Sequence, residues 1–336
     1  MASHKILDQG YWKSKLFYWQ SLMYYYLYSA RFRSIVWFCP LNPSIHMAGM
    51  LDENKSDIYD ILPEEYLPKT QLITSDMHIG ESSALTVPFP MIAKPNIGLK
   101  GWKVIKLFDF DEFVELRKND GKIDWILQEF IDFEEEYAVL CTKHPGNGEI
   151  QITSVTRKIY PFVIGKGKDT LKFLIETKND AYLNVPEVLA INNENLDRVV
   201  QRGERYMLHN IGNYSRGSKF YNANELIDNE LIAAFTPIML HLKGIFFCRF
   251  DLKTHNVAAM KRGEFKVLEM NGAKSEPLHI YDPNFGWLAS IKTIHCHWVE
   301  IASIVRYQLK HANAVLPTTQ EGLAALRGVR KVFEKE

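Results

Sequence analysis

The feature that most constrains the fold is a series of short apolar or alternating segments between residues 88 and 164, each bounded by Gly, Pro, Asn or Asp. Such segments are typical of β-strands joined by tight turns. The second half of the chain instead contains longer segments predicted to be helical, including residues 288–311. Antiparallel strands carrying helices on one side predict an α+β fold and not a doubly wound parallel sheet. The expected strands are 91–94, 103–107, 125–130, 137–142, 150–157, 162–164, 244–252 and 265–270, with a further short strand at 34–39.

Helix signals accompany these strands. We expect a short capped helix over 55–62, a helix over 109–117 capped by Asp109, and a helix from Asn222 to about residue 242. Thr318 and Glu321 predict the start of a last helix.

Composition excludes several classes of protein. The 336 residues are 46% hydrophobic and 24% charged, as in ordinary globular chains. Lys+Arg and Asp+Glu both number 40, so no bulk charge favours nucleic acid, and we expect no nucleic-acid partner. The four cysteines form no CxxC pair, which argues against a zinc ribbon or a disulfide framework and favours a reducing compartment. Because no secretory signal is present, we expect a cytoplasmic protein.

The N-terminal region is rich in tyrosine and tryptophan. Its longest charge-free stretch, residues 16–30, is too short to span a bilayer, so no membrane span is expected. The favoured interpretation is an aromatic helix buried on the domain or in a homodimer interface. A helix lying on a membrane surface is the alternative.

Acidic and amide side chains close two neighbouring strands in the second half. Asp251 ends one strand, and Glu269 and Asn271 end the next. If these strands pair, the three side chains converge, and their oxygens are of the kind that binds Mg²⁺. Arg249 lies two residues before Asp251 and shares its face. The alternative is that these carboxylates merely end strands at the surface.

Two earlier segments could hold a nucleotide. Lys94 ends a buried strand before a turn that contains Gly98 and Gly101, and such turns can cradle phosphate. A plain hairpin is the alternative there. Further on, the segment Gln128-Glu129-Phe130-Ile131 could meet an adenine edge and Glu136 a ribose, although a solvated acidic turn would explain the same residues.

The order of these segments resembles the ATP-grasp superfamily, and most of all carboxylate–amine ligases of the D-alanine–D-alanine ligase type. The resemblance covers residues 50–312 and is most specific at Arg249-x-Asp251 and Glu269-x-Asn271. Two stretches, residues 163–171 and 213–218, are similar to the cyanophycin synthetase branch.

The resemblance implies an ATP-grasp fold, in which two α+β subdomains with antiparallel sheets grip the nucleotide. The implied divisions are a short helical, aromatic N-terminal region (1–70), an ATP-grasp domain (71–315) with a lid at about 88–142, and a C-terminal helix (316–336). The implied activity is ATP-dependent, Mg²⁺-dependent amide formation from a small carboxylate and an amine through an acyl-phosphate. A small-molecule kinase and a non-catalytic nucleotide-binding protein are the alternatives.

The resemblance also assigns roles to individual residues. Arg249 and Arg157 would be catalytic, with Lys158 as the alternative to Arg157 at the γ-phosphate. Apart from the resemblance, Glu276 and His279 are candidates for the acceptor pocket because they closely follow the strand end at Asn271. The Mg²⁺ ligands would be Asp251, Glu269 and Asn271. The ATP-binding residues would be Lys55, Lys94, Gly98, Gly101, Gln128, Glu129, Ile131 and Glu136.

Overall fold

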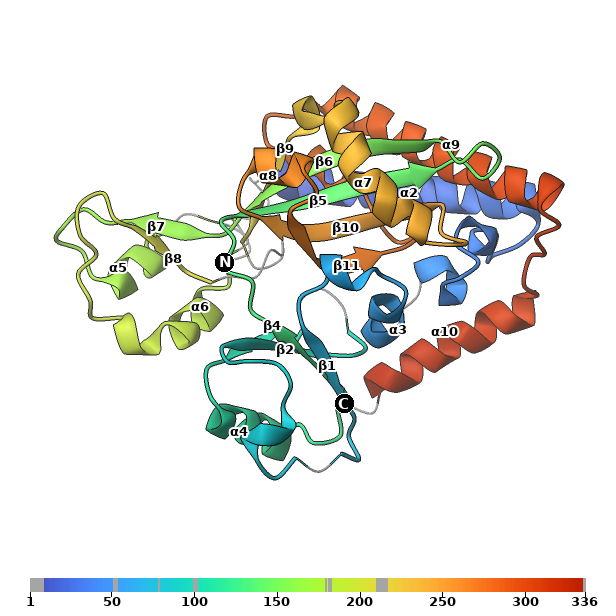
Figure 1. The fold of residues 1–336 in the computed structure, drawn as a ribbon. Helices are drawn as coiled ribbons and strands as arrows, with labels where there is room; N and C mark the ends of the chain where they lie inside the picture. The colour runs from blue at the N-terminus through green and yellow to red at the C-terminus, as the bar shows by residue number, and fades with distance from the viewer. Residues whose placement is uncertain are drawn as a thin grey trace.

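A five-stranded antiparallel sheet forms the centre of the molecule (Figure 1). The computed structural model describes residues 9–50, 54–77, 79–98, 102–178, 180, 183–209 and 217–334. The strand order is β11-β10-β5-β6-β9. The strands are β5 (Glu135–Lys143), β6 (Ile150–Ile159), β9 (Lys219–Asn222), β10 (Phe247–Thr254) and β11 (Phe265–Asn271).

Helices cover both faces of this sheet, whereas the sequence predicted helices on one side. Side chains alternate along each strand, so β10 turns Phe250 toward one face and Phe247 toward the other. The Phe250 face packs against α7 (Asn229–His241) and α3 (Lys55–Asp60). The Phe247 face packs against α2 (Gln9–Phe32) and α9 (Trp287–His311). The prediction was wrong because the alternation of side chains along a strand does not show whether helices cover one face of the sheet or both.

A smaller antiparallel sheet lies below the large one in Figure 1. Its order is β1-β4-β2-β3, and α4 (Phe110–Asn119) packs on one face of it. Asp109 caps α4, as predicted, by accepting a hydrogen bond from the Glu112 amide. β1 lies outside the expected 88–142 lid segment, and β5, which that segment includes, belongs to the large sheet. The strands are β1 (Thr70–Ile73), β2 (Met91–Pro95), β3 (Ile105–Leu107) and β4 (Trp125–Glu129).

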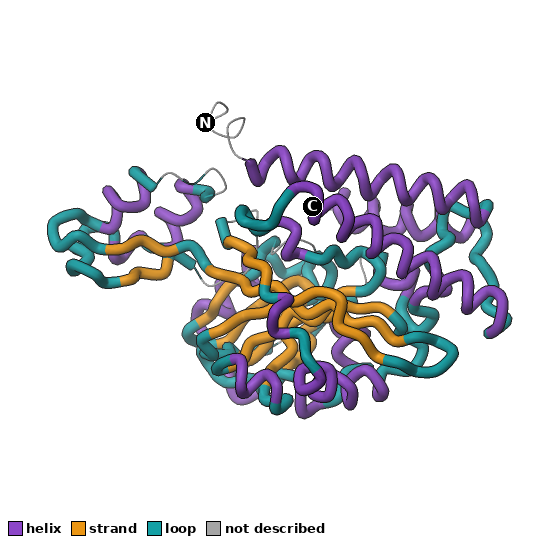
Figure 2. Tube along the Cα trace, turned by 90° about the horizontal axis from the view of Figure 1, so that it is seen from above, coloured by secondary structure: helices purple, strands orange, loops and turns teal. Residues whose placement is uncertain are grey.

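A third unit projects from the side of the molecule in both ribbon and tube views (Figures 1 and 2). It has its own apolar core, with Leu171 and Val200 fully buried. The sequence signals for the individual elements did not indicate a separate unit. Its elements are β7 (Phe162–Ile164), β8 (Arg205–Met207), α5 (Leu171–Glu176) and α6 (Val185–Ile191).

Two predicted elements differ from the structure. Residues 34–39 do not form a strand: residues 35–38 form turns and Cys39 begins a 3₁₀ segment. Within these turns Trp37 packs into an aromatic cluster, stacked on Phe32 and close to Tyr28. Asn222 ends β9, and the helix expected to start there begins after Asp228, whose carboxylate accepts from the Leu231 amide. The helix therefore begins later than the signal at Asn222 predicted, after the 3₁₀ segment Asn224–Leu226.

The remaining helices are short or terminal. Thr318 and Glu321 cap α10 (Thr319–Glu334), as predicted. No helix of the described residues is both long and apolar enough to cross a membrane. The other helices are α8 (Val257–Lys261) and the 3₁₀ segments Cys39–Leu41, His46–Gly49, Glu64–Tyr66, Ser82–Ala84, Asn193–Asn195, Asn224–Leu226 and Leu278–Tyr281.

Candidate nucleotide and metal site

The predicted metal residues meet on one face of the large sheet. In the antiparallel pairing of β10 with β11, Asp251 lies opposite Glu269 and Arg249 lies opposite Asn271. Because side chains alternate, these four residues point away from the face that packs on α7. The sequence prediction that the two strand ends converge is therefore confirmed.

Arg249 and Asp251 form a buried ion pair. The Nε atom of Arg249 lies 2.9 Å from Oδ1 of Asp251, and Nη2 lies 3.1 Å from Oδ2. Nζ of Lys158 is 3.4 Å from the same Oδ2. Burial alone would raise the pKa of Asp251, but the Arg249 and Lys158 cations outweigh it and hold that pKa below its usual value. The carboxylate is therefore ionised, as a metal ligand must be.

Lys158 links two predicted site residues. Its ammonium is 2.9 Å from Oε1 of Glu136 as well as near Asp251, and all three side chains are almost fully buried. Burial lowers the pKa of Lys158, yet the Asp251 and Glu136 carboxylates raise it overall. Tyr160 also donates a hydrogen bond to Glu136. In this structure the Glu136 carboxylate thus contacts protein groups at the position where a ribose was expected.

Arg157 is not part of this group. It precedes Lys158 on β6 and so points to the opposite face, where its guanidinium lies 2.6 Å from Glu135 and is about half exposed. The structure therefore places Lys158, and not Arg157, beside Asp251.

Lys94 reaches from the small sheet to the large one. Its Nζ donates to the side-chain oxygen of Gln128 at 2.9 Å and to the carbonyl oxygen of Leu268 on β11 at 3.0 Å. Tyr59 donates to the same carbonyl at 2.9 Å, and the Lys94 ammonium lies 5.0 Å from its ring centroid. Burial, only partly offset by the Glu269 carboxylate, lowers the pKa of Lys94 to about 7.

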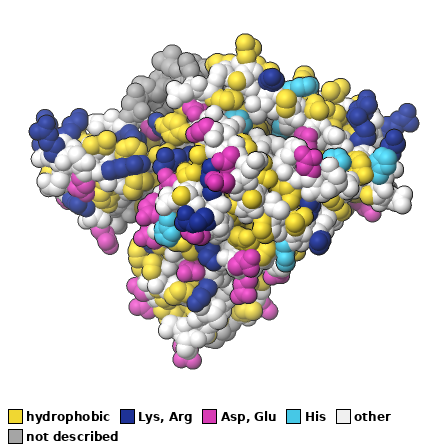
Figure 3. All heavy atoms as spheres, turned by 45° about the horizontal axis from the view of Figure 1, so that its top comes forward, with side chains coloured by type: hydrophobic (Ala, Val, Ile, Leu, Met, Phe, Trp, Pro, Cys, Tyr) yellow, Lys and Arg dark blue, Asp and Glu magenta, His cyan; other side chains and the backbone are white. Residues whose placement is uncertain are grey.

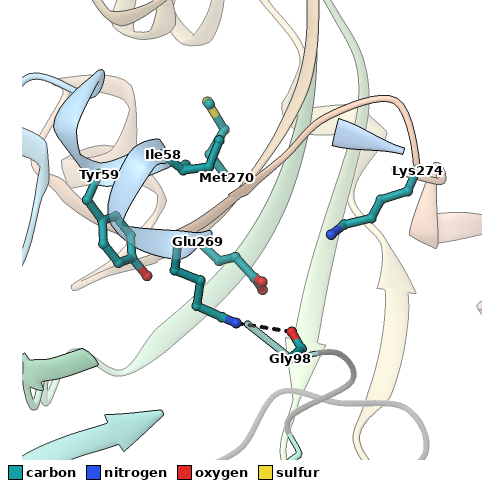
Figure 4. Close-up of a pocket in the computed structure, with 7 residues that line it drawn as sticks. Ile58, Tyr59, Gly98, Glu269, Met270 and Lys274 are labelled. Carbon is teal, nitrogen blue, oxygen red and sulfur yellow. Dashed lines mark hydrogen bonds between the residues drawn. The ribbon is translucent and has the colours of Figure 1, made fainter. Parts of the chain in front are cut away.

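A pocket opens between β11 and the segment that follows β2 (Figure 4). The Glu269 carboxylate and the Lys274 ammonium both point into this space. Lys55 donates to the carbonyl oxygens of Pro95 and Gly98, at 3.1 and 3.0 Å. The pocket is lined by Lys55, Ile58, Tyr59, Gly98, Glu269, Met270 and Lys274. Gly101, and residues 213–216 of the second cyanophycin-like stretch, lie outside the described residues.

The expected adenine segment is held by protein contacts. Gln128 is buried between Lys94 and Thr70, and its amide group donates to the Thr70 hydroxyl at 3.3 Å. A Glu129 oxygen accepts from the Lys69 amide at 3.1 Å. The Ile131 carbonyl accepts from Lys253 at 2.9 Å. These contacts place the segment at the junction of the two sheets.

The residues present fit a magnesium ion. Asp251, Glu269 and Asn271 supply two carboxylates and one amide, the hard oxygen donors that Mg²⁺ prefers. The Asn271 amide nitrogen is buried with no hydrogen-bond partner among the described residues. In the part of the chain that the structure describes, no three His, Cys, Asp or Glu side chains are grouped so that they could hold a metal ion.

Several residues near the site were not predicted. Lys253 follows Asp251 by two positions and shares its face, so strand periodicity could have identified it. The Ser154 hydroxyl and Nδ1 of His279 are 2.6 Å apart and buried, and burial lowers the pKa of His279 to about 4. The sequence identified His279 as a candidate for the acceptor pocket, but no pattern in the sequence indicated that Ser154 would lie beside it. Arg249 also approaches the Glu276 carbonyl at 3.5 Å.

The antiparallel sheets and the helices that pack on them make this an α+β fold, with charged side chains at the junction of the two larger sheets. No family model and no curated protein sequence matches the chain. Among solved structures, a D-alanine–D-alanine ligase from Bacillus anthracis has a TM-score of 0.44 and 12% identity, over 77% of this chain and 71% of that one. A bifunctional glutathione synthetase from Pasteurella multocida has a TM-score of 0.41 and 14% identity, over 76% and 38%.

A third solved structure, an ADP complex of the N5-carboxyaminoimidazole ribonucleotide synthetase purK, has a TM-score of 0.39 and 14% identity, over 68% of this chain and 47% of that one.

Proposed function

We propose that the chain binds Mg²⁺–ATP between its two sheets and uses it to activate a carboxylate for attack by an amine. The observation that carries this proposal is the meeting of Lys94, from the small sheet, with the strand that bears Glu269 and Asn271. Cations from one sheet and oxygen donors from the other are the two halves of a nucleotide triphosphate site.

The lysines would bind the phosphates. Lys55 donates to the backbone carbonyls of Pro95 and Gly98, and Lys94 donates to the Gln128 amide oxygen and the Leu268 carbonyl. A phosphate oxygen is a stronger acceptor for an ammonium than either group. The Lys158 ammonium, which contacts the Asp251 and Glu136 carboxylates, would bind the γ-phosphate in place of Arg157.

Asp251, Glu269 and Asn271 would hold Mg²⁺, which when bound neutralises phosphate charge and orients the transferred group. Arg249 keeps the Asp251 carboxylate fixed and ionised through its two hydrogen bonds. Its guanidinium would also stabilise the negative charge that develops as the acyl group reacts.

The reaction has two balanced steps. A carboxylate oxygen of the acid attacks the γ-phosphorus, and ADP leaves with the electron pair of the broken P–O bond. The amine nitrogen then attacks the acyl carbon, the C–O bond to phosphate breaks, and the amine loses a proton as phosphate leaves. Exclusion of water matters because an acyl-phosphate hydrolyses readily.

Product analysis tests this proposal against the two alternatives. Purified chain is incubated with Mg²⁺–ATP and with panels of amino acids and small dicarboxylates, and ADP and phosphate are both measured. A ligase releases phosphate only when an acid and an amine are both present. ADP formation without phosphate indicates a kinase, and no turnover with any panel indicates a non-catalytic binding protein. The Glu269→Gln variant serves as the control for background hydrolysis.

A further inference from the structure

Helix α2 is apolar on two opposite faces. Phe17 and Tyr28 are buried against α9 and the residues around Trp37. The opposite face carries a row of large exposed side chains at helical spacing, with Trp19 64% and Tyr26 62% exposed. We call this row the α2 stripe: Leu16, Trp19, Met23, Tyr26 and Leu27. A surface helix normally presents polar residues to water, so an apolar outer face marks an interaction surface.

The apolar surface continues onto α9. The Gln20 side chain donates to the Ile291 carbonyl at 2.9 Å, which fixes the two helices side by side. Next to this contact, α9 exposes Ile291 and Leu288, the latter 83% exposed. Figure 2 shows the long helices lying along one side of the molecule, and Figure 3 shows hydrophobic side chains mixed with Lys and Arg along the upper edge.

The charged residues of α2 and of the segment that follows it have one sign. Residues 9–51 contain no Asp or Glu, whereas Lys and Arg occur near both ends of α2. Lys15 and Arg31 are exposed and flank the stripe on either side of the helix, and Arg33 follows directly after it. On α9, Lys292 is exposed beside Ile291. Large apolar and aromatic side chains bordered by cations are typical of helices that lie in the interface of an anionic bilayer.

We propose that the α2 stripe docks on the surface of an anionic phospholipid bilayer, with α2 lying in the plane of the interface. Trp19 and Tyr26 would sit at the level of the headgroups, which suits side chains with an apolar ring and one polar atom. Lys15 and Arg31 would meet lipid phosphates. The inner face of α2 would stay packed on α9, so the contact is peripheral, in keeping with the absence of a helix able to cross a membrane among the described residues.

Charge disfavours a second copy of the chain as the occupant. In an antiparallel pair of α2 helices, Lys15 of one copy would lie beside Arg31 and Arg33 of the other. In a parallel pair, each cation would lie beside its own equivalent. Both arrangements place like charges together with no carboxylate from residues 9–51 to compensate, whereas an anionic surface complements all of them.

Vesicle flotation of the full chain tests the proposal. We expect binding to vesicles of phosphatidylcholine mixed with phosphatidylglycerol, and at least about tenfold weaker binding to phosphatidylcholine alone. Replacing Trp19 and Met23 together by Ser should abolish binding. High salt should weaken binding of the wild type, and the double variant Lys15→Gln, Arg31→Gln should bind anionic vesicles more weakly than the wild type at low salt. The matched control is Ile191→Ser, which removes a similarly exposed apolar side chain from α6. Unchanged thermal melting shows that each variant is folded.

Other outcomes overturn the proposal. Equal binding to neutral and anionic vesicles, no binding to either, or undiminished binding by the Trp19/Met23 variant would each contradict it. Sedimentation velocity measures the oligomeric state. A wild type that is a dimer and a Trp19/Met23 variant that is a monomer would identify a second copy of the chain as the occupant and overturn the proposal.

Discussion

The Arg249 guanidinium donates to both carboxylate oxygens of Asp251, two residues further along the same strand. Strand periodicity explains this pairing, because residues two apart on a strand share a face. Together with the nearby Lys158 ammonium, the guanidinium compensates the charge of the buried Asp251 carboxylate. It also positions the arginine directly beside the proposed metal ligands.

Replacing Arg249 by Lys should lower turnover by about 10²–10³-fold and leave ATP affinity nearly unchanged, because Lys cannot supply two parallel donors. Steady-state kinetics together with nucleotide binding would measure both quantities. Arg262→Lys is the control, since Arg262 makes the same two-donor contact with Glu264, two residues along, but at the exposed surface. Wild-type turnover in Arg249→Lys would show that the pair is only structural.

Asp251→Asn should destabilise the fold by about 3 kcal/mol or more, because it leaves the buried Arg249 and Lys158 cations with one carboxylate fewer. Urea denaturation monitored by circular dichroism gives the free energy of unfolding. Glu264→Gln, which removes a carboxylate from an exposed pair, should change stability little. Equal stabilities for the two variants would contradict the account of the buried charges.

Nucleotide binding should take up a proton near neutral pH. The pKa of Lys94 is about 7 without ligand, so above that pH much of the lysine is uncharged, and phosphate oxygens would raise its pKa. Affinity should therefore fall as pH rises through this range. Isothermal calorimetry in buffers of different ionisation enthalpy measures the uptake, which should vanish at about pH 6, where Lys94 is already charged. Proton release instead of uptake would be inconsistent with this role for Lys94.

Gly272→Ala should destabilise the loop after β11. A methyl group at this position would lie 2.9 Å from the Cα of Gly49 and would clash with the Ala48 carbonyl, which accepts a hydrogen bond from the Ala273 amide at 2.8 Å. The expected cost is about 1–3 kcal/mol. Gly286→Ala is the control, because a methyl group there meets nothing within 4 Å. Thermal melting of both variants decides whether this close approach matters.

How far the sequence predicted the site depended on whether a residue's partners were near it in the chain. Alternation within β10 and β11 was enough to predict that Asp251, Glu269 and Asn271 share a face. The same rule, applied to β6, would have separated Arg157 from Lys158.

Contacts between distant segments could not be predicted. The hydrogen bond from Lys94 to Leu268 and the one between Ser154 and His279 join segments more than a hundred residues apart, and no local pattern encodes either. The same limit explains the fold errors: short strands and helix caps are local, whereas the covering of the large sheet on both faces depends on where α2 and α9 return to it.

The most direct test of the central claim is the binding of a non-hydrolysable ATP analogue in the presence and absence of Mg²⁺, measured by thermal shift on the wild type and on Glu269→Gln. Glu269 points into the pocket, so the variant should fold normally. We predict a Mg²⁺-dependent rise in melting temperature for the wild type and a much smaller one for the variant. No shift in the wild type at saturating analogue, or an equal shift without Mg²⁺, would contradict a magnesium–nucleotide site between the two sheets.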